Sequence, residues 1–283
     1  MDLRPDQLDS RHRHIVDTCE PFVISYPANY DALDFAPMGF VIPEHRRYTA
    51  TRLSSRDVID GLHHLDAVTF GDQEMLMPRW VLFDCGEFPG MVFGFGRAAR
   101  ELPMVAREAY DVVDRDEAFV PLSMWVAIPC AEPDAWFGHN LSSANLVLKG
   151  KDALPGLATL TKVLGVGVTQ AKRQYGATQW DSSSISLHLR LGPMEVLSAY
   201  TPAHTHPETL SYLIQVDDKT LAAAISPRKH SEDLSGDRII EAGDSQTIRD
   251  LHDEIESGIR WQMVRAEKRA DGPQRLHLVR LPA

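Results

Sequence analysis

Hydrophobic and polar positions along the chain follow two periods, one typical of strands and one typical of helices. Apolar runs bounded by Pro, Gly, Ser or Asp predict strands. The predicted strands are 21–25, 40–52, 119–129, 184–191, 194–200 and 209–216. After Ser54 and Ser55, which can cap a helix, apolar residues recur at helical spacing from 58 to 68. A strand that leads into an amphipathic helix is therefore expected in the first quarter of the chain.

Two further apolar runs, 80–85 and 91–95, are separated by the residues GEFPG. The Pro and Gly of this connection are typical of a turn, so the pattern predicts a hairpin. Glu87 would lie in that turn. Residues 97–118 are charged and predict a helix or a long surface loop, and FGHNLSSANLVLKG at 137–150 predicts a further strand and an exposed turn.

The segment 154–171 carries leucine and valine at helical spacing, with Lys162 at its centre. Gly165 and Gly167 have low helix propensity, so the pattern predicts a short helix that ends near Leu164.

The remaining sequence is assigned as follows. Residues 1–20 are polar and predict a loose lead-in or a surface helix. Near the C-terminus the pattern predicts short strands at 221–225 and 238–240, a helix at 246–258, and β-like segments at 259–269 and 275–282. Helices between groups of strands predict an α+β fold with a large antiparallel sheet and a few short helices. We expect one domain over residues 1–283.

Composition narrows the class of protein. Hydrophobic residues make up 43% of the chain and charged residues 24%, as in ordinary globular proteins. The formal net charge of −11 would repel nucleic acid and anionic membranes. The sequence has neither an apolar run long enough to span a bilayer nor a signal-peptide core at its start. Its three cysteines form no CxxC pair. We therefore expect a cytoplasmic protein without nucleic-acid or membrane partners.

Lys162 is a candidate nucleophile. A lysine amine whose pKa is lowered by burial is neutral and can attack a carbonyl carbon to form an imine. Lys162 lies among apolar neighbours, in a segment poor in charge. The alternative is that it lies on the solvent side of its helix, as most lysines do.

Three other residues complete a candidate site for such chemistry. Glu87 would orient the substrate or transfer a proton if the hairpin placed it over a pocket. Arg46 and Arg47 would hold a substrate carboxylate in a bidentate grip. The alternatives are a solvated turn for Glu87 and a surface edge strand for the arginine pair.

The order of these segments resembles that of the acetoacetate decarboxylase superfamily. HRRY, with Arg46 and Arg47, precedes a helix as an arginine-bearing strand does in that family. DCGEFPG is similar to the turn that holds a functional glutamate, which would be Glu87, and TKVLG is similar to the segment that holds the reactive lysine, which would be Lys162. The similarity spans residues 46–216 and implies a cone-like or barrel-like sheet.

Some positions depart from the family pattern. His139 and Asn140, in GHNLS, stand where the family has arginine and glutamate, and would contact substrate. Val163 replaces the second lysine of the family's adjacent pair. A different register would make Lys149 or Lys151 the amine.

The resemblance implies an enzyme that acts on a small β-keto acid or related carbonyl compound through a lysine imine. The imine withdraws electrons from the adjacent bond, which allows decarboxylation or aldol and dehydration chemistry. The resemblance implies no cofactor. It does imply a homo-oligomer. Two alternatives remain: a double hot-dog acyl-thioester enzyme, suggested by a recurring order of one helix and three strands, and a non-catalytic domain that binds a small molecule.

Two other groups of residues are candidates for a binding site. His204 and His206 flank one residue and could hold a metal ion together with His139 or Glu208, although HxH pairs are common without metal. Gln179 and Trp180 could contact a polar small molecule, or Trp180 could belong to the core. Cys85 has no identifiable histidine partner and is expected to be buried and inert.

Overall fold

The computed structural model describes residues 7–26, 41–49, 56–73, 76–202, 206–227 and 236–282. These residues form two compact units. Unit 1 contains residues 1–132, 138–170 and 225–227, and unit 2 contains residues 133–137, 171–224 and 228–283. The units are described separately below, and the single domain expected from the sequence stays a prediction.

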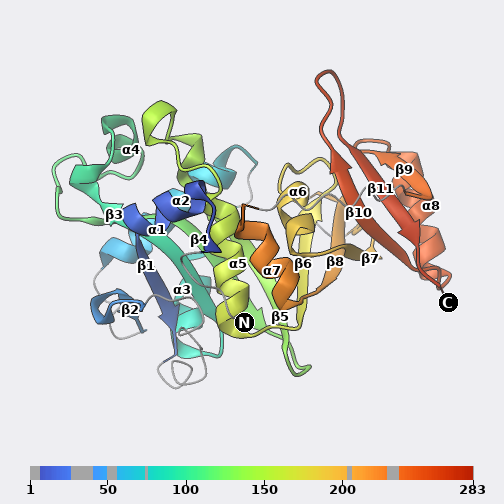
Figure 1. Cartoon of the computed structure of the whole chain (residues 1–283), viewed down its shortest axis with the longest axis horizontal. Coiled ribbons are helices and arrows are strands. Elements are labelled where there is room, and N and C mark those ends of the chain that lie inside the picture. The colour runs from blue at the N-terminus through green and yellow to red at the C-terminus, as the bar shows by residue number, and fades with distance from the viewer. Residues whose placement is uncertain are drawn as a thin grey trace. The chain divides into compact units, whose positions relative to one another are not determined.

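Unit 1 contains both helices and strands (Figure 1). Its strands are β1 (Glu20–Ser25), β2 (Arg47–Tyr48), β3 (Met91–Ala98), β4 (Phe119–Pro129) and β5 (Ala135–Ser143), of which β5 enters the unit at Gly138. Its helices are α1 (Ser10–Thr18), α2 (Arg56–Phe70), α3 (Arg79–Glu87), α4 (Met104–Ala109) and α5 (Leu157–Thr169). The strands follow one another in the order β2-β1-β3-β4-β5.

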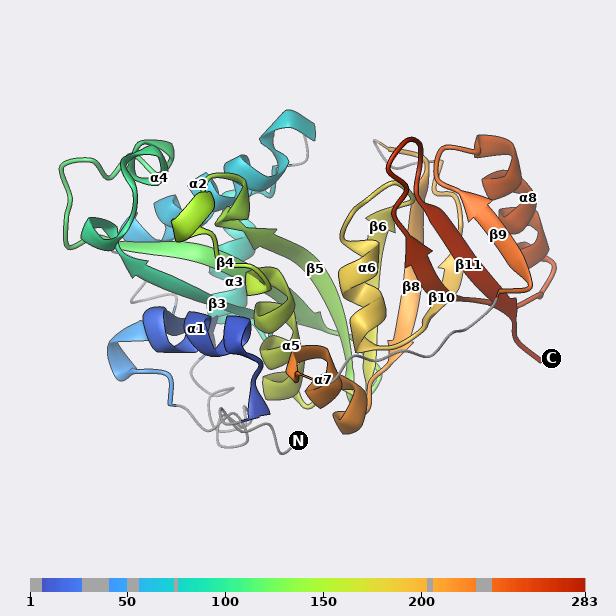
Figure 2. The ribbon, with the colours of Figure 1, turned by 45° about the horizontal axis from the view of Figure 1, so that its top comes forward.

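The sheet of unit 1 is mixed. β1 pairs with β2 in parallel, whereas β1 with β3 and β3 with β4 are antiparallel. Helices α1 and α5 lie on one face of this sheet, and α2 and α3 lie on the other (Figures 1 and 2). Because both faces are covered, β3 and β4 are buried along most of their length. This explains why the sequence shows them as continuous apolar runs.

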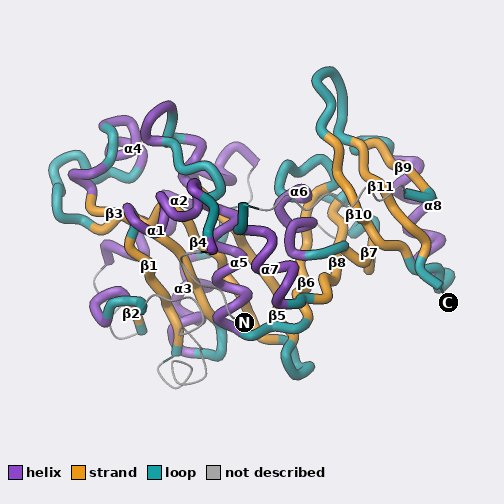
Figure 3. Tube along the Cα trace, viewed as in Figure 1, coloured by secondary structure: helices purple, strands orange, loops and turns teal. Residues whose placement is uncertain are grey.

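Unit 2 has the strands β6 (Arg173–Gln179), β7 (Met194–Ser198), β8 (Thr209–Gln215), β9 (Arg238–Glu241), β10 (Trp261–Glu267) and β11 (Arg275–Arg280). Its helices are α6 (Ile185–His188), α7 (Asp218–Ile225) and α8 (Ser245–Glu256). The strand order is β6-β8-β7-β10-β11-β9, and every neighbouring pair in it is antiparallel. Figure 3 shows helices and strands in both units, so the α+β class is confirmed.

The expected closure of the sheet into a cone or barrel is wrong. In both units the strand order is linear, and it ends at the two-residue strand β2 in unit 1 and at β9 in unit 2. A barrel requires the first and last strands to pair with each other. These edges remain open instead.

Several predicted strands are helices in the structure. The segment 80–85, expected as the first strand of a hairpin, lies in α3. The expected strand 184–191 contains α6, and the expected strand 221–225 lies in α7. Short apolar runs do not distinguish a buried strand from a buried helix, and this explains the errors. The recurrence of one helix and three strands is likewise broken, because α6 lies between β6 and β7.

Candidate functional site

Lys162 lies in the middle of helix α5. The helix begins after Gly156, which has a left-handed backbone conformation with φ of 90°, and nearly all of its residues are buried. The helix packs on β3 and β4. The side chain of Lys162 is 1% exposed, and burial lowers its pKa to about 7. The expectation of a buried amine is therefore confirmed, and the solvent-side alternative is wrong.

Helix α5 continues five residues beyond its expected end near Leu164. A Cβ atom built on Gly165 would lie 2.3 Å from the ring of Trp125 in β4. Glycine at this position therefore allows the helix to approach the sheet closely. This packing outweighs the low helix propensity of glycine.

The other two candidate amines lie at the surface. Lys149 and Lys151 are both exposed, and Lys149 Nζ donates a hydrogen bond to the carbonyl oxygen of Asn145 at 3.4 Å. Among Lys149, Lys151 and Lys162, only Lys162 is buried, and its burial allows a large fraction of the amine to be uncharged near pH 7.

Glu87 is not in a hairpin turn. It is the last residue of α3 and is exposed. Since α3 and α5 lie on opposite faces of the sheet of unit 1, the structure does not bring Glu87 to Lys162 (Figure 2). The two residues that the sequence joined into one site are therefore separate.

The arginine pair is held by contacts near the β2 edge. Arg46 Nε donates to Glu20 Oε2 at 2.6 Å, and its guanidinium lies 3.8 Å from the centre of the Phe119 ring. Arg47 Nε donates to the carbonyl oxygen of Ile42 at 3.0 Å. These contacts match the edge-strand alternative better than a bidentate grip on substrate.

His139 and Asn140 lie next to each other in β5 and have different surroundings. Asn140 Nδ2 donates to Asp66 Oδ1 at 2.8 Å, and the buried Asp66 also accepts from the backbone N–H of Met77 at 2.6 Å. Asn140 therefore helps to join β5 to α2. His139 is partly exposed, and burial of the rest of its side chain lowers its pKa, while the carboxylate of Asp66 offsets part of that shift.

His139 lies at the edge of a pocket in unit 1 that the sequence did not reveal. This α3 pocket has a volume of about 310 Å³ and is lined mainly by apolar side chains of α3, the 88–90 turn and the end of β4. Its main residues are Trp80, Asp84, Phe88, Ile128, Pro129 and His139. Trp80 and Phe88 are 63% and 59% exposed.

The polar groups of the α3 pocket are few. Asp84 contributes the carboxylate, and no Lys or Arg is found among the described residues that line the pocket. Trp80 and Asp84 are four residues apart, so a helical reading of 79–87 would have placed them on one face. Because the sequence pattern predicted a strand here, it did not indicate that these two side chains lie on one face.

Cys85 also lines the α3 pocket. It is 2% exposed, and burial raises the pKa of its thiol to about 12, with the Asp84 carboxylate adding to the shift. The thiolate is therefore scarce at neutral pH, as expected for a structural cysteine.

The remaining candidates belong to unit 2 or fall outside the described residues. Trp180 is 1% exposed and its indole N–H donates to the carbonyl oxygen of Ala199 at 2.8 Å, so it is a core residue rather than the wall of a site. Gln179 ends β6 and is half-buried. His204 lies outside the described residues, and no group of three metal-ligating side chains occurs within them.

Comparisons with known proteins leave the family open. No protein-family model matches the chain, and no curated protein matches it. One solved structure that is similar to this chain is an aminoglycoside 6'-acetyltransferase type Ii, with 14% identity and a TM-score of 0.37, over 62% of this chain and 94% of that one. A TM-score of this size carries no argument about activity. The resemblance to the acetoacetate decarboxylase superfamily stays a prediction.

The helices were also compared with what is needed to span a membrane. Within the described ranges, none of them combines the length and apolar character that a membrane crossing requires.

Proposed function

We propose that this protein binds a small organic amine with an apolar body in the α3 pocket. The observation that carries the proposal is the lining: apolar and aromatic residues together with Asp84, and neither Lys nor Arg among the described lining side chains. Pockets of this size that combine apolar walls with a few polar groups are typical of small-molecule sites.

Charge decides the class of ligand. An ammonium group near Asp84 would gain a charge-assisted hydrogen bond, and the exposed indole of Trp80 offers a ring face for a cation. A substrate carboxylate would instead meet Asp84, and none of the described lining residues is a Lys or Arg that could offset the repulsion. The α3 pocket therefore favours an amine over the keto acid expected from the sequence.

His139 gives this site a base. Its lowered pKa keeps the imidazole neutral at neutral pH, so one ring nitrogen can accept a hydrogen bond from the bound ammonium. A neutral imidazole is also a common acceptor for a proton from a reacting nitrogen. The α3 pocket thus combines a carboxylate, Asp84, with a base, His139.

Calorimetric titration with 2-phenylethylamine, 3-phenylpropanoate and 2-phenylethanol tests the proposal. We expect the amine to bind at least about tenfold more tightly than the carboxylate, because one charge-assisted hydrogen bond contributes about that factor. Asp84→Asn should remove the preference. Asp72→Asn, at an exposed position outside the pocket, is the matched control. Equal or tighter binding of 3-phenylpropanoate by the unmodified protein would refute the proposal.

The buried amine of Lys162 favours a second candidate, the decarboxylase-like enzyme implied by the sequence resemblance. In it, the amine adds to a ketone and water leaves as the C=N bond forms. The iminium then accepts the electron pair of the adjacent bond as carbon dioxide or a proton departs. Because Lys162 is 1% exposed, a substrate reaches it only when α5 opens locally from the sheet.

Borohydride reduction in the presence of acetoacetate, followed by peptide mass analysis, tests this candidate. The expected result is one adduct on Lys162 that disappears in Lys162→Ala. Lys172→Ala is the control, because the Lys172 side chain is 61% exposed and lies outside α5, in the bend before β6. Absence of the adduct, or labelling spread over surface lysines, would exclude the candidate while leaving amine binding in the α3 pocket unaffected.

A further inference from the structure

A buried carboxylate in unit 1 contacts the elements on both sides of the α3 pocket. Asp66 belongs to α2 and is 1% exposed. Its Oδ2 atom accepts a hydrogen bond from the backbone N–H of Met77 at 2.6 Å, and its Oδ1 atom accepts one from Asn140 Nδ2 at 2.8 Å. A buried carboxylate is costly unless its oxygens are hydrogen-bonded, so these two bonds hold their donors firmly in place.

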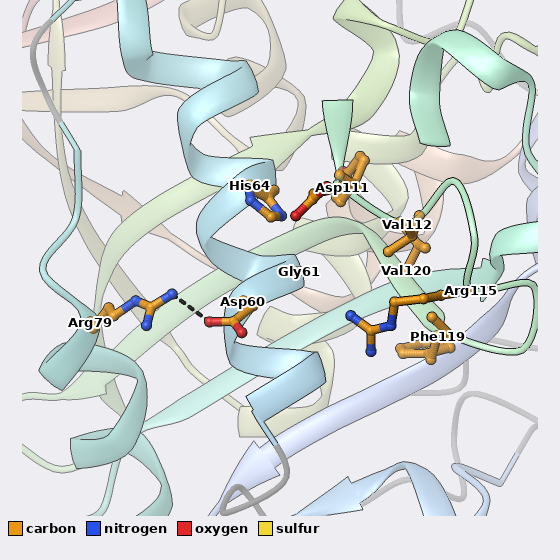
Figure 4. A pocket seen from close by; sticks show the side chains of 11 residues that line it. Asp60, Gly61, His64, Arg79, Asp111, Val112, Arg115, Phe119 and Val120 are labelled. Carbon is orange, nitrogen blue, oxygen red and sulfur yellow. Dashed lines mark hydrogen bonds and ion pairs between the residues drawn. The ribbon is translucent and has the colours of Figure 1, made fainter. Parts of the chain in front are cut away.

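The first hydrogen bond fixes the start of α3. Met77 lies two residues before Arg79, the first residue of α3, and three residues before Trp80. Arg79 also forms an ion pair with Asp60 of α2, which Figure 4 shows in the wall of another cavity of unit 1. The side chains of this pair are 57% and 37% exposed, and exposed ion pairs contribute little to stability. The buried bond to Asp66 is therefore the stronger connection between α2 and α3.

The second hydrogen bond fixes β5 beside His139. Asn140 is the next residue of that strand. The hydroxyl of Ser142 donates to Asn140 Oδ1 at 2.7 Å, so the Asn140 amide is held at both ends while its N–H group donates to Asp66. His139 lies on the β5 side of the α3 pocket, and Trp80 lies on the α3 side. One carboxylate thus holds the segments on both sides of the pocket.

The charge of Asp66 also acts on His139. Burial lowers the pKa of His139, and the Asp66 carboxylate opposes part of this shift because it favours the imidazolium form. Asp84, the carboxylate in the pocket lining, comes from α3 instead. Asp66 is therefore close enough to the imidazole for its charge to be measured there.

We propose that Asp66 is a positioning residue of the α3 pocket. It sets the separation of Trp80 and His139, because it holds the segments that carry them. Asp66 is not among the described lining residues, so it acts through its two hydrogen-bond partners. This role rests on the amine binding proposed above: a ring face and a base that meet one ammonium must be held in place, since a displacement of about 1 Å weakens such a site.

Calorimetric titration of the full-length protein with 2-phenylethylamine tests this role. Asn140→Ala removes the bond to β5 and keeps the carboxylate of Asp66, so we expect the affinity to fall at least about fivefold. Asn145→Ala is the matched control, because Asn145 makes two hydrogen bonds with the backbone of Leu154 in the same unit, outside the pocket. It should leave the affinity within about twofold of the unmodified protein. Full affinity in Asn140→Ala, or an equal loss in both variants, overturns the proposal.

A second measurement uses the protein without ligand. NMR titration of the histidine rings gives the pKa of His139, and His139→Gln assigns its signal. Asp66→Asn keeps the shape of the side chain but removes its charge, so the pKa of His139 should fall further below its ordinary value. Asp72→Asn, at an exposed position outside the pocket, should leave that pKa unchanged. An unchanged pKa in Asp66→Asn overturns the proposal, and if that variant does not fold, the affinity of Asn140→Ala decides.

The positioning role and the proposed function can fail separately. An unmodified protein that does not prefer the amine refutes the proposed function. Normal amine binding by the unmodified protein, together with full affinity in Asn140→Ala, refutes only the role of Asp66.

Discussion

At the scale of single residues, the environment of each side chain decides its chemistry. Lys162 and Lys149 have the same amine, yet α5 packs the first against the sheet, and the second is exposed. Burial disfavours the ammonium form, so the pKa of Lys162 falls to about 7.

The lowered pKa of Lys162 makes folding stability depend on pH. The unfolded chain binds a proton at this lysine up to its ordinary pKa, and the folded chain releases it near pH 7, so stability rises with pH between those values. From pH 7 to pH 9 we expect a gain of roughly 2 kcal/mol in the free energy of unfolding, because the slope approaches about 1.4 kcal/mol per pH unit only above the folded pKa and is about half of that at pH 7. Lys162→Met should remove this gain, as measured by urea denaturation at both pH values. An unchanged pH dependence in the variant would contradict the burial of the amine.

The lowered pKa of His139 also makes amine binding depend on pH. Below its lowered pKa the imidazole gains a proton and repels a bound ammonium, so affinity for 2-phenylethylamine should fall severalfold between pH 8 and pH 5. In His139→Gln the affinity should vary little over this range. Calorimetry at both pH values measures it, and an equal decline in the variant would assign the effect to another group.

At the scale of elements, tertiary packing determined where helices begin and end. Helix α5 continues through Gly165 because the close packing of this residue on Trp125 stabilises the helix. A larger residue at this position would clash with the Trp125 ring. Helix α3 formed where an apolar run suggested a strand, since its residues 81, 82, 85 and 86 are buried at helical spacing.

Substitution of Gly165 separates packing from propensity. Alanine favours a helix by about 1 kcal/mol over glycine, but its methyl group would lie 2.3 Å from the Trp125 ring. We expect Gly165→Ala to lower the free energy of unfolding by about 2 kcal/mol, because overpacking dominates. Gly71→Ala is the control, since a Cβ there meets nothing within 4 Å. A Gly165→Ala protein as stable as the control variant would show that the helix is not held this closely.

At the scale of the whole molecule, the net charge of the protein affects how strongly any charged ligand binds. The net charge of −11 attracts cations and repels anions, and salt screens the effect. The homo-oligomer and the cytoplasmic location expected from the sequence stay predictions.

Amine binding should therefore weaken as salt rises. Between about 0.05 and 0.5 M NaCl the Debye length falls by about threefold, so affinity for 2-phenylethylamine should decrease severalfold while that for neutral 2-phenylethanol stays constant. Calorimetry at both salt concentrations provides the measurement. A parallel loss for both compounds would show that salt acts on the protein rather than on the ligand charge.

The amino-acid sequence was enough to predict the α+β class, the buried strands β3 and β4, the half-buried strands β7 and β8, and the terminal pair β10 and β11. It did so because apolar periodicity and turn residues are local signals. It also identified Lys162 as an amine among apolar neighbours.

Only the tertiary structure decided which residues share a site. It separated Glu87 from Lys162, placed Trp180 in the core, and joined His139 to Trp80 and Asp84 in the α3 pocket. The open sheet was equally beyond the sequence. The physical reason is that burial and proximity depend on contacts between residues far apart in the chain, and these contacts leave no local period in the sequence.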